Sequence, residues 1–459
     1  MEKAVLVAGS GISGIGAVKL LKQVGRSVIL YDGNEKLDRE EIKRNAQDAS
    51  LEVILGELTQ DVLNKIEYCV ISPGISLEVP FVQTLKESGI PIWSEIELAY
   101  HYAKGTLAAI TGTNGKTTTT ALLGAMVQNW IGKERGFIVG NIGIPYTQMA
   151  QEMGEDAITV AEISSFQLET IQTFHPKVSA ILNITPDHLN RHHTMECYTQ
   201  VKESITKNQT DQEWCILNYE DERLRQFGDR ARVKVLYFSS KRKLEEGMYL
   251  DGDLIMLRYD KKEYEICNIG ECHLVGICNY ENIMAASGMA YCLGVPMDVI
   301  KKTVKEFRAV EHRIEFVEEI EGVRYYNDSK GTNPDAAIQG IRAMNRPTFI
   351  IAGGYDKGSE YDEWITEFGD KVKRLVLLGQ TAEKIADCAR KHGFTHISFV
   401  SDLKEAVALC AREAKPGDAV LLSPACASWG MFINYEERGR IFKELVRERM
   451  NCRSSHTVE

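Results

Sequence analysis

Residues 107–118, LAAITGTNGKTT, decide the fold class of the middle of the chain. A short apolar run leads into a glycine-rich turn, and a helical pattern follows over 119–127. This order of strand, glycine turn and helix is how a P-loop presents backbone amides to phosphate. The turn departs from the full Walker pattern, because Ile110 stands where that pattern has glycine. We predict a nucleotide site in which Lys116 reaches the β- and γ-phosphates and the Thr117 hydroxyl binds Mg²⁺.

Polar residues follow the next two predicted strands, at 157–161 and 178–182. Glu162 follows the first strand, and the second leads into NITPDH, which ends at His188. Ligands of α/β sheets bind at the carboxyl ends of strands, and a carboxylate is a suitable Mg²⁺ ligand. His188 fits a functional role or a solvated surface equally well. Lys202 by itself has the pattern of an exposed helical lysine.

The N-terminal part has a second glycine-rich turn, GSGISG at 9–14, between an apolar strand at 4–8 and a helix. Asp32 follows the next strand, 27–31, eighteen residues beyond Gly14. This context is typical of a dinucleotide fingerprint. The motif indicates a diphosphate site at a helix N-terminus. Both a nicotinamide dinucleotide and a UDP-sugar carry such a diphosphate.

The last third has strands that end at a regular spacing of 22 to 26 residues, at Asp328, Gly353, Gly379, Ser401 and Ser423. Helical patterns between them predict a doubly wound sheet. A polar stretch at about 240–270 predicts a hairpin lying over the central domain. We therefore predict an α/β protein of three domains: a Rossmann-like N-terminal domain (1–95), a central P-loop ATPase-type domain with a parallel sheet (96–308) and a Rossmann-like, doubly wound C-terminal domain (309–459).

The composition argues against several classes of protein. The 459 residues carry a net charge of −11, which argues against a general nucleic-acid binder. No apolar run reaches the roughly 18 residues of a membrane span, and the N-terminus lacks the pattern of a signal peptide. Eleven cysteines without a C-x-x-C pair predict reduced thiols and a cytoplasmic protein.

Seven segments together resemble the Mur ligases, and the resemblance reaches all three parts of the chain. The segments are GTNGKTT (112–118), GNIG (140–143), EISSFQLE (162–169), NITPDHLNRH (183–192), HR (312–313), NDSKGTN (327–333) and SPACAS (423–428).

The resemblance implies an ATP-dependent ligase whose N-terminal domain holds the UDP part of its substrate, whose central domain holds ATP, and whose C-terminal domain holds the incoming amino acid. The most similar member joins D-glutamate to UDP-N-acetylmuramoyl-L-alanine through an acyl phosphate, in peptidoglycan precursor synthesis. Three small-molecule substrates, two Mg²⁺ ions and a monomer are implied, with no nucleic-acid partner.

The resemblance also implies roles for individual residues. Lys116, His188 and Lys202 would be catalytic, and Lys202 would be carbamylated, which makes it a carboxylate-like group. Metal ligands would be Thr117, Glu162, His188 and Lys202. The implied ATP contacts are Gly112, Thr113, Asn114, Gly115, Lys116, Thr117, Thr118, Asn282, Arg313 and Asp328. The implied contacts to the UDP substrate are Gly11, Ser13, Asp32, Ser72, Gly74 and Asn141.

The implied D-glutamate contacts are Thr332, Lys357, Ser428 and Tyr435, although the family pattern favours phenylalanine at Tyr435. Cys426, with no histidine nearby in the sequence, is expected to be a small buried residue. Three alternatives remain open: a nicotinamide oxidoreductase, a sibling ligase or folylpolyglutamate synthase, and a P-loop protein that only binds nucleotide. A folylpolyglutamate synthase lacks this UDP-binding front domain.

Overall fold

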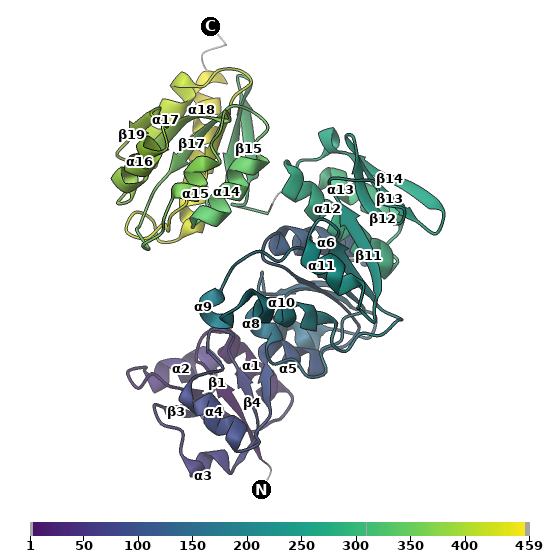
Figure 1. Cartoon of the computed structure of the whole chain (residues 1–459). Helices are drawn as coiled ribbons and strands as arrows, with labels where there is room; N and C mark the ends of the chain where they lie inside the picture. The colour runs from purple at the N-terminus through teal and green to yellow at the C-terminus, as the bar shows by residue number, and fades with distance from the viewer. Residues whose placement is uncertain (1–2, 309, 455–459) are drawn as a thin grey trace. The chain divides into compact units, whose positions relative to one another are not determined.

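The apolar run at 4–8 becomes the buried strand β1 (Ala4–Ala8) at the centre of the first sheet. The computed structural model describes residues 3–308 and 310–454 (Figure 1). The first sheet is parallel and has the order β3-β2-β1-β4-β5. Its other strands are β2 (Val28–Asp32), β3 (Glu52–Leu55), β4 (Ile66–Ile71) and β5 (Ile92–Ser94), and its helices are α1 (Ile12–Gln23), α2 (Arg39–Ala46), α3 (Gln60–Leu63) and α4 (Pro80–Glu87). The strand order reverses between β1 and β4, which is where such sheets form a ligand crevice.

The central sheet has nine strands in the order β14-β13-β12-β11-β10-β9-β6-β8-β7. Its strands are β6 (Thr106–Thr111), β7 (Gly136–Gly140), β8 (Ile158–Glu162), β9 (Val178–Ile181), β10 (Trp214–Asn218), β11 (Lys234–Ser239), β12 (Gly247–Asp251), β13 (Leu254–Tyr259) and β14 (Lys262–Asn268). The helices of this part are α5 (Glu95–Tyr102), α6 (Lys116–Ile131), α7 (Tyr146–Met149), α8 (Ser165–Leu168), α9 (Leu189–His192), α10 (Met195–Glu203), α11 (Glu222–Gly228), α12 (Ile277–Leu293) and α13 (Met297–Glu306).

The hairpin predicted at about 240–270 exists, but its predicted place is wrong. Strand β12 pairs in parallel with β11 and antiparallel with β13, so the hairpin extends the edge of the central sheet and does not lie over the domain. Without the hairpin, β11 would be an edge strand with unpaired backbone N–H and C=O groups. Strand β12 pairs with β11 and so continues the sheet.

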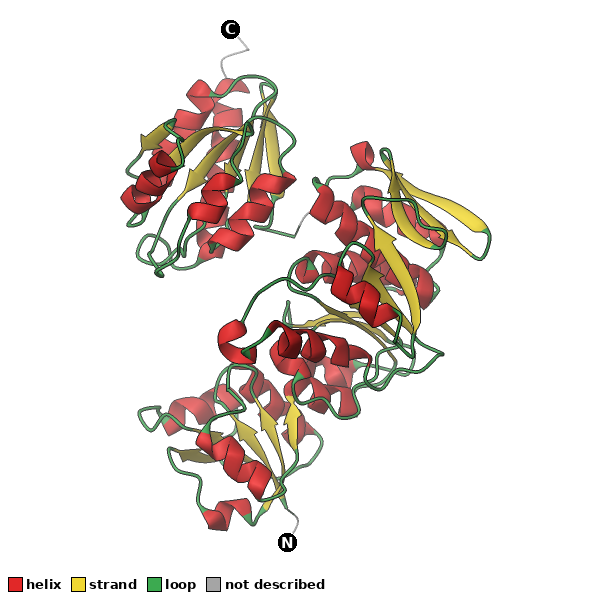
Figure 2. Ribbon diagram, in the orientation of Figure 1, coloured by secondary structure: helices red, strands yellow, loops and turns green. Residues whose placement is uncertain are grey.

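The third sheet has the order β15-β16-β20-β17-β18-β19. Figure 2 shows this sheet with helices packed along it. It is parallel except for β15, which pairs antiparallel with β16. Its strands are β15 (Glu315–Ile320), β16 (Val323–Asn327), β17 (Thr348–Ala352), β18 (Val372–Leu377), β19 (Ile397–Phe399) and β20 (Ala419–Leu422), and its helices are α14 (Pro334–Ala343), α15 (Asp362–Thr366), α16 (Ala382–Lys391), α17 (Leu403–Glu413) and α18 (Tyr435–Ser454). The predicted α/β class, with a separate sheet in each of the three predicted parts of the chain, is confirmed.

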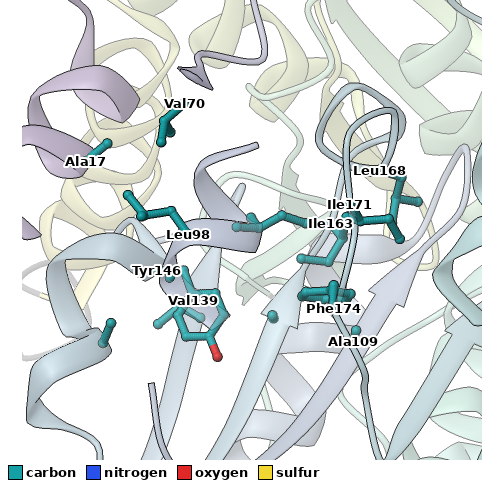
Figure 3. Packing of buried hydrophobic residues seen from close by; sticks show 14 of the residues in the cluster. Ala17, Val70, Leu98, Ala109, Val139, Tyr146, Ile163, Leu168, Ile171 and Phe174 are labelled. Carbon is teal, nitrogen blue, oxygen red and sulfur yellow. The ribbon is translucent and has the colours of Figure 1, made fainter. Parts of the chain in front are cut away.

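The contacts between residues group the chain into two compact units. The first contains Met1–Cys267 and Asn282–Val304, and the second contains Asn268–Glu281 and Lys305–Glu459. Within the first unit, one apolar cluster includes residues of both the first and the central sheet. Figure 3 shows Leu98 of α5 in this cluster, near Val70 on one side and Tyr146 on the other. None of the helices among the described residues is long and apolar enough to cross a membrane.

Candidate active site

The glycine-rich turn after β6 has the backbone geometry of a phosphate-binding loop. Gly112 and Gly115 have φ angles of +146° and +86°, which side chains with a Cβ rarely adopt. A Cβ on Gly115 would overlap Oδ1 of Asn282, a buried residue of α12 whose Oδ1 also accepts from Thr119 Oγ1 at 3.3 Å. The turn ends where α6 begins at Lys116, so its amides and the helix N-terminus face the same side.

Two lysines converge on the backbone carbonyl of Gly112. Lys116 Nζ donates to this oxygen at 2.8 Å and to Thr113 O at 2.9 Å. Lys202 Nζ, from α10, donates to the same Gly112 oxygen at 2.9 Å, and its residue is only 1% exposed. Burial, with a smaller contribution from the charge on Lys116, lowers the pKa of Lys202 well below its usual range. The interpretation of Lys202 as an exposed lysine is therefore wrong.

Glu162, the last residue of β8, presents a buried carboxylate at the same edge of the sheet. Its Oε1 accepts from Asn141 Nδ2 at 3.0 Å, and the residue is 2% exposed. Its Oε2 is buried and has no hydrogen-bond partner among the described residues. An ionised oxygen left without a donor is costly unless a cation or water meets it. Together with the Thr117 hydroxyl at the start of α6, this donor set fits a hard divalent cation such as Mg²⁺.

The segment after β9 is hydrogen-bonded to the phosphate-binding loop. Asn183 Oδ1 accepts from Asn114 N at 2.8 Å, and its Nδ2 donates to Asn114 O at 3.1 Å. Thr113 Oγ1 accepts from Thr185 N at 3.0 Å and lies 3.2 Å from the hydroxyl of Tyr198. These contacts fix the loop against the strand end and against α10.

The two neighbouring histidines 188 and 192 have different environments. The side chain of His188 is 48% exposed, and its Nε2 lies 3.4 Å from Asp187 Oδ2. His192 is 2% exposed, and its Nε2 lies 3.0 Å from Ser165 Oγ. Burial lowers the pKa of His192 to about 4, so the ring is neutral at pH 7. The predicted metal role of His188 stays a prediction.

Five predicted contacts to the UDP substrate line one pocket of about 820 Å³ at the switch point of the first sheet: Gly11, Ser13, Asp32, Ser72 and Gly74. Asp32 Oδ2 accepts from Ser10 N at 3.0 Å and from Ser10 Oγ at 2.7 Å, which fixes the glycine turn to the end of β2. The rings of Tyr31 and Phe81 also line the pocket, with centroids 4.8 Å apart. Asn141, the sixth predicted contact, hydrogen-bonds instead to the carboxylate of Glu162.

In the second unit, Asp328 follows β16 and is buried. Its Oδ2 accepts from Ser423 Oγ at 2.8 Å, and its Oδ1 accepts from Ile314 N at 3.2 Å. Burial raises the pKa of Asp328 to about 7, although the nearby Arg313 charge opposes this. Arg313 Nε is itself buried and has no hydrogen-bond partner among the described residues, as expected of a group that meets an anionic ligand.

The four predicted D-glutamate residues lie on loops at the carboxyl ends of strands in the second unit or at the start of the helix that follows. Lys357 Nζ lies 5.1 Å from the ring centroid of Trp429, next to the buried Ser428. Tyr435 is the first residue of α18, and burial raises its pKa to about 12. Thr332 belongs to the segment that follows Asp328.

Arg438, which no sequence pattern marked, holds these loops together. This arginine is 2% exposed; it donates from Nε to Ser329 Oγ at 3.0 Å and from a terminal nitrogen to Cys426 O at 3.2 Å. A single arginine in a highly charged helix has the pattern of a surface residue, so no sequence signal marked it. Cys426 is buried, as expected.

Comparison with known proteins gives three family matches in chain order. The Mur ligase MurD-like N-terminal domain matches residues 3–94, the Mur ligase middle domain matches 110–290, and the Mur ligase glutamate ligase domain matches 312–426.

Curated relatives and solved structures extend these matches to nearly the full length. The UDP-N-acetylmuramoylalanine--D-glutamate ligase of Lachnospira eligens is 56% identical over 97% of this chain and 98% of its own length. The protein of the same name from Lachnoclostridium phytofermentans is 55% identical over the same shares. The solved MurF ligase of Thermotoga maritima, in complex with ADP, has a TM-score of 0.58 at 17% identity, covering 98% of this chain and 96% of that chain, which shows a common fold. This chain therefore belongs to the Mur ligase family.

Proposed function

We propose that this chain catalyses the ATP-dependent addition of D-glutamate to UDP-N-acetylmuramoyl-L-alanine, a step in peptidoglycan precursor synthesis. The observation that carries this proposal is the 56% identity, over 97% of the chain, to a curated ligase of that name. The family membership also leaves the nicotinamide alternative without support, because the glycine turn of the first sheet belongs to a MurD-like N-terminal domain.

The chemistry requires a carboxylate to become an electrophile. The L-alanyl carboxylate attacks the γ-phosphorus of ATP, ADP leaves, and an acyl phosphate forms. The amine of D-glutamate then attacks the acyl carbon, its nitrogen releases a proton to solvent, and inorganic phosphate leaves with the pair of electrons of the C–O bond. The first step brings two anions together, so the chain must supply positive charge and hydrogen-bond donors around the γ-phosphate.

Lys116 and the loop amides are the donors proposed for this task. In the structure the Lys116 ammonium is satisfied by the carbonyls of Gly112 and Thr113. A short rotation of its side chain would move it from these neutral acceptors to phosphate oxygens, which are stronger acceptors. The turn at Gly115 keeps the loop backbone close enough for its amides to donate to the phosphates as well.

Thr117 and Glu162 are proposed to hold one Mg²⁺, and His188 a second. The unpartnered Oε2 of Glu162 supports the first assignment. When bound, Mg²⁺ offsets negative charge on the phosphates. Asn141, through its hydrogen bond to Oε1, fixes the orientation of the Glu162 carboxylate.

Lys202 is proposed to be carbamylated. Only a neutral amine adds to carbon dioxide, and burial favours the neutral form of this lysine. The resulting carbamate carries a negative charge close to the Lys116 ammonium. It would therefore form an attractive pair of opposite charges with Lys116.

The test is a panel of amino acids offered with UDP-N-acetylmuramoyl-L-alanine, ATP and magnesium, scored for ADP release. We expect release with D-glutamate and only background with L-glutamate, glycine or lysine. Release that depends on another amino acid would replace D-glutamate and indicate a sibling ligase. ATP binding without release would favour the binding-only alternative.

Lys116→Ala provides the matched control for this panel. We expect ADP release to fall by about 100-fold or more, while binding of the UDP substrate, measured by calorimetry, stays within a few-fold. Full turnover by this variant would remove Lys116 from the proposed mechanism.

A further inference from the structure

Three potential metal ligands meet on the second unit, apart from the residues proposed for the ligase reaction. They are the carboxylate of Asp362, the thiol of Cys388 and the imidazole of His392, and their ligand atoms all lie within 4.8 Å of one another. His392 Nε2 is 2.8 Å from Asp362 Oδ1. The group is partly exposed, so an ion from solution can reach it.

The local structure explains why these side chains converge. Cys388 lies in the last turns of α16 and His392 caps the same helix, four residues later, so both project from one face. The carboxyl end of a helix carries a partial negative charge, which favours a cation beside His392. Asp362, at the start of α15, approaches this face from a neighbouring element.

The donor set is selective in its chemistry. Sulfur, imidazole nitrogen and carboxylate oxygen are the ligands that Zn²⁺ takes in proteins, whereas Mg²⁺ and Ca²⁺ take oxygen ligands. Three protein ligands leave the fourth tetrahedral position to water. We propose that Asp362, Cys388 and His392 bind one Zn²⁺ ion, at a site separate from the magnesium sites of the reaction.

Lys391 competes with such an ion. Its ammonium lies 3.0 Å from Asp362 Oδ1, but its side chain is 73% exposed. An exposed ion pair contributes little to stability, so the lysine can turn into water when a divalent cation binds. The contacts of Asp362 with His392 and Lys391 alone would also suit a simple surface ion pair, and the experiment must separate the two.

The experiment is a titration of the full-length, reduced protein with Co²⁺, which reports thiolate coordination by a charge-transfer band and tetrahedral geometry by its visible bands. We expect both signals to saturate at one equivalent and to disappear when Zn²⁺ is added. Cys388→Ser should remove the charge-transfer band, and His392→Gln and Asp362→Asn should weaken binding. The affinity for Co²⁺ should fall by at least about 10- to 100-fold, because removal of a residue that only hydrogen-bonds a metal ligand already costs that much.

Three control variants make the result decisive. Cys197→Ser removes an exposed thiol elsewhere, and Asp387→Asn removes an exposed carboxylate on α16, so both should bind like the parent protein. Lys391→Ala should tighten binding several-fold, because the competing cation is gone. An absent charge-transfer band, or one that survives in Cys388→Ser, would overturn the proposal. Because the readout is binding, its outcome is independent of the proposed ligase activity.

Discussion

Lys202 is a residue whose chemistry depends on its burial. Exposed lysines stay protonated at pH 7, whereas the low pKa of this one favours the neutral amine. We predict that the protein incubated with ¹³C-bicarbonate shows a carbamate carbon signal by NMR, which is absent in Lys202→Gln. Lys104→Gln, at an exposed lysine, should keep the signal. A signal of equal size in Lys202→Gln would place the carbamate on another amine.

Asp328 is a second buried ionisable residue, and its burial has a measurable consequence. Its pKa of about 7 in the folded protein exceeds its usual value of 3.8, so the folded state binds the proton more tightly than the unfolded state. The stability from this group is therefore present below pH 3.8 and is lost as the pH rises to 7. Asp328→Asn keeps an acceptor for Ser423 but cannot ionise.

We predict a change in the free energy of unfolding of Asp328→Asn relative to that of the parent protein. This difference should rise by about 2 kcal/mol in favour of the variant as the pH increases from 5 to 8. Urea unfolding followed by tryptophan fluorescence measures this difference. Asp370→Asn, at an exposed residue of the same unit, should show no such change. A difference that shrinks toward pH 8 would contradict the raised pKa.

Sequence patterns predicted residues in unusual, contiguous motifs and failed for isolated ones. The glycine turn and Glu162 could be found because each directly follows a strand. Lys202 could be found only through the family resemblance, since its helix has the composition of an exposed one. Arg438 carried no signal at all, because its partner Ser329 lies 109 residues earlier in the chain.

At the scale of elements, the turn between β6 and α6 requires a glycine at position 115. Alanine there would meet both a left-handed backbone angle and Oδ1 of Asn282. We predict that Gly115→Ala lowers ADP release by about 100-fold, because a loop displaced by about 1 Å no longer positions the phosphates.

Gly252→Ala is the matched control for this turn. Gly252 also has a positive φ, +57°, but an added Cβ would meet open space in the β12–β13 turn. This variant should lose about 1 kcal/mol of stability from backbone strain and keep its rate of ADP release. Equal rates for the two variants would show that the contact with Asn282 does not matter.

Long elements were predicted from the sequence more completely than short or edge strands. Strand β1 and helix α6 match the patterns predicted at 4–8 and 119–127, and the last sheet follows the predicted spacing. Strand β5 has three residues, too few for a period-two pattern, and β15 (EFVEEI) is too acidic to suggest a strand. Both gain their stability from pairing with a neighbouring strand, which local sequence does not report.

At the scale of the whole molecule, the first and central sheets belong to one unit, joined through α5. Glu97 of this helix is fully buried, and its carboxylate accepts from the amides of Gln172 at 2.9 Å, Thr173 at 2.7 Å and Phe174 at 3.0 Å. These donors belong to the central part, between α8 and β9. Removal of the carboxylate would leave three backbone amides without their acceptor, including that of the buried Phe174.

We predict that Glu97→Ala destabilises the first unit by about 3 kcal/mol. Because α5 packs in the core that both sheets share, hydrogen exchange should accelerate in β1 and β6 alike, but not in β17 of the second unit. Mass spectrometry of peptides from these strands measures this pattern. Glu155→Ala, at a side chain 82% exposed, should leave all three unchanged. Faster exchange in β6 alone would mean that the first sheet holds its structure without the Glu97 junction, and the shared core would then not couple the two sheets.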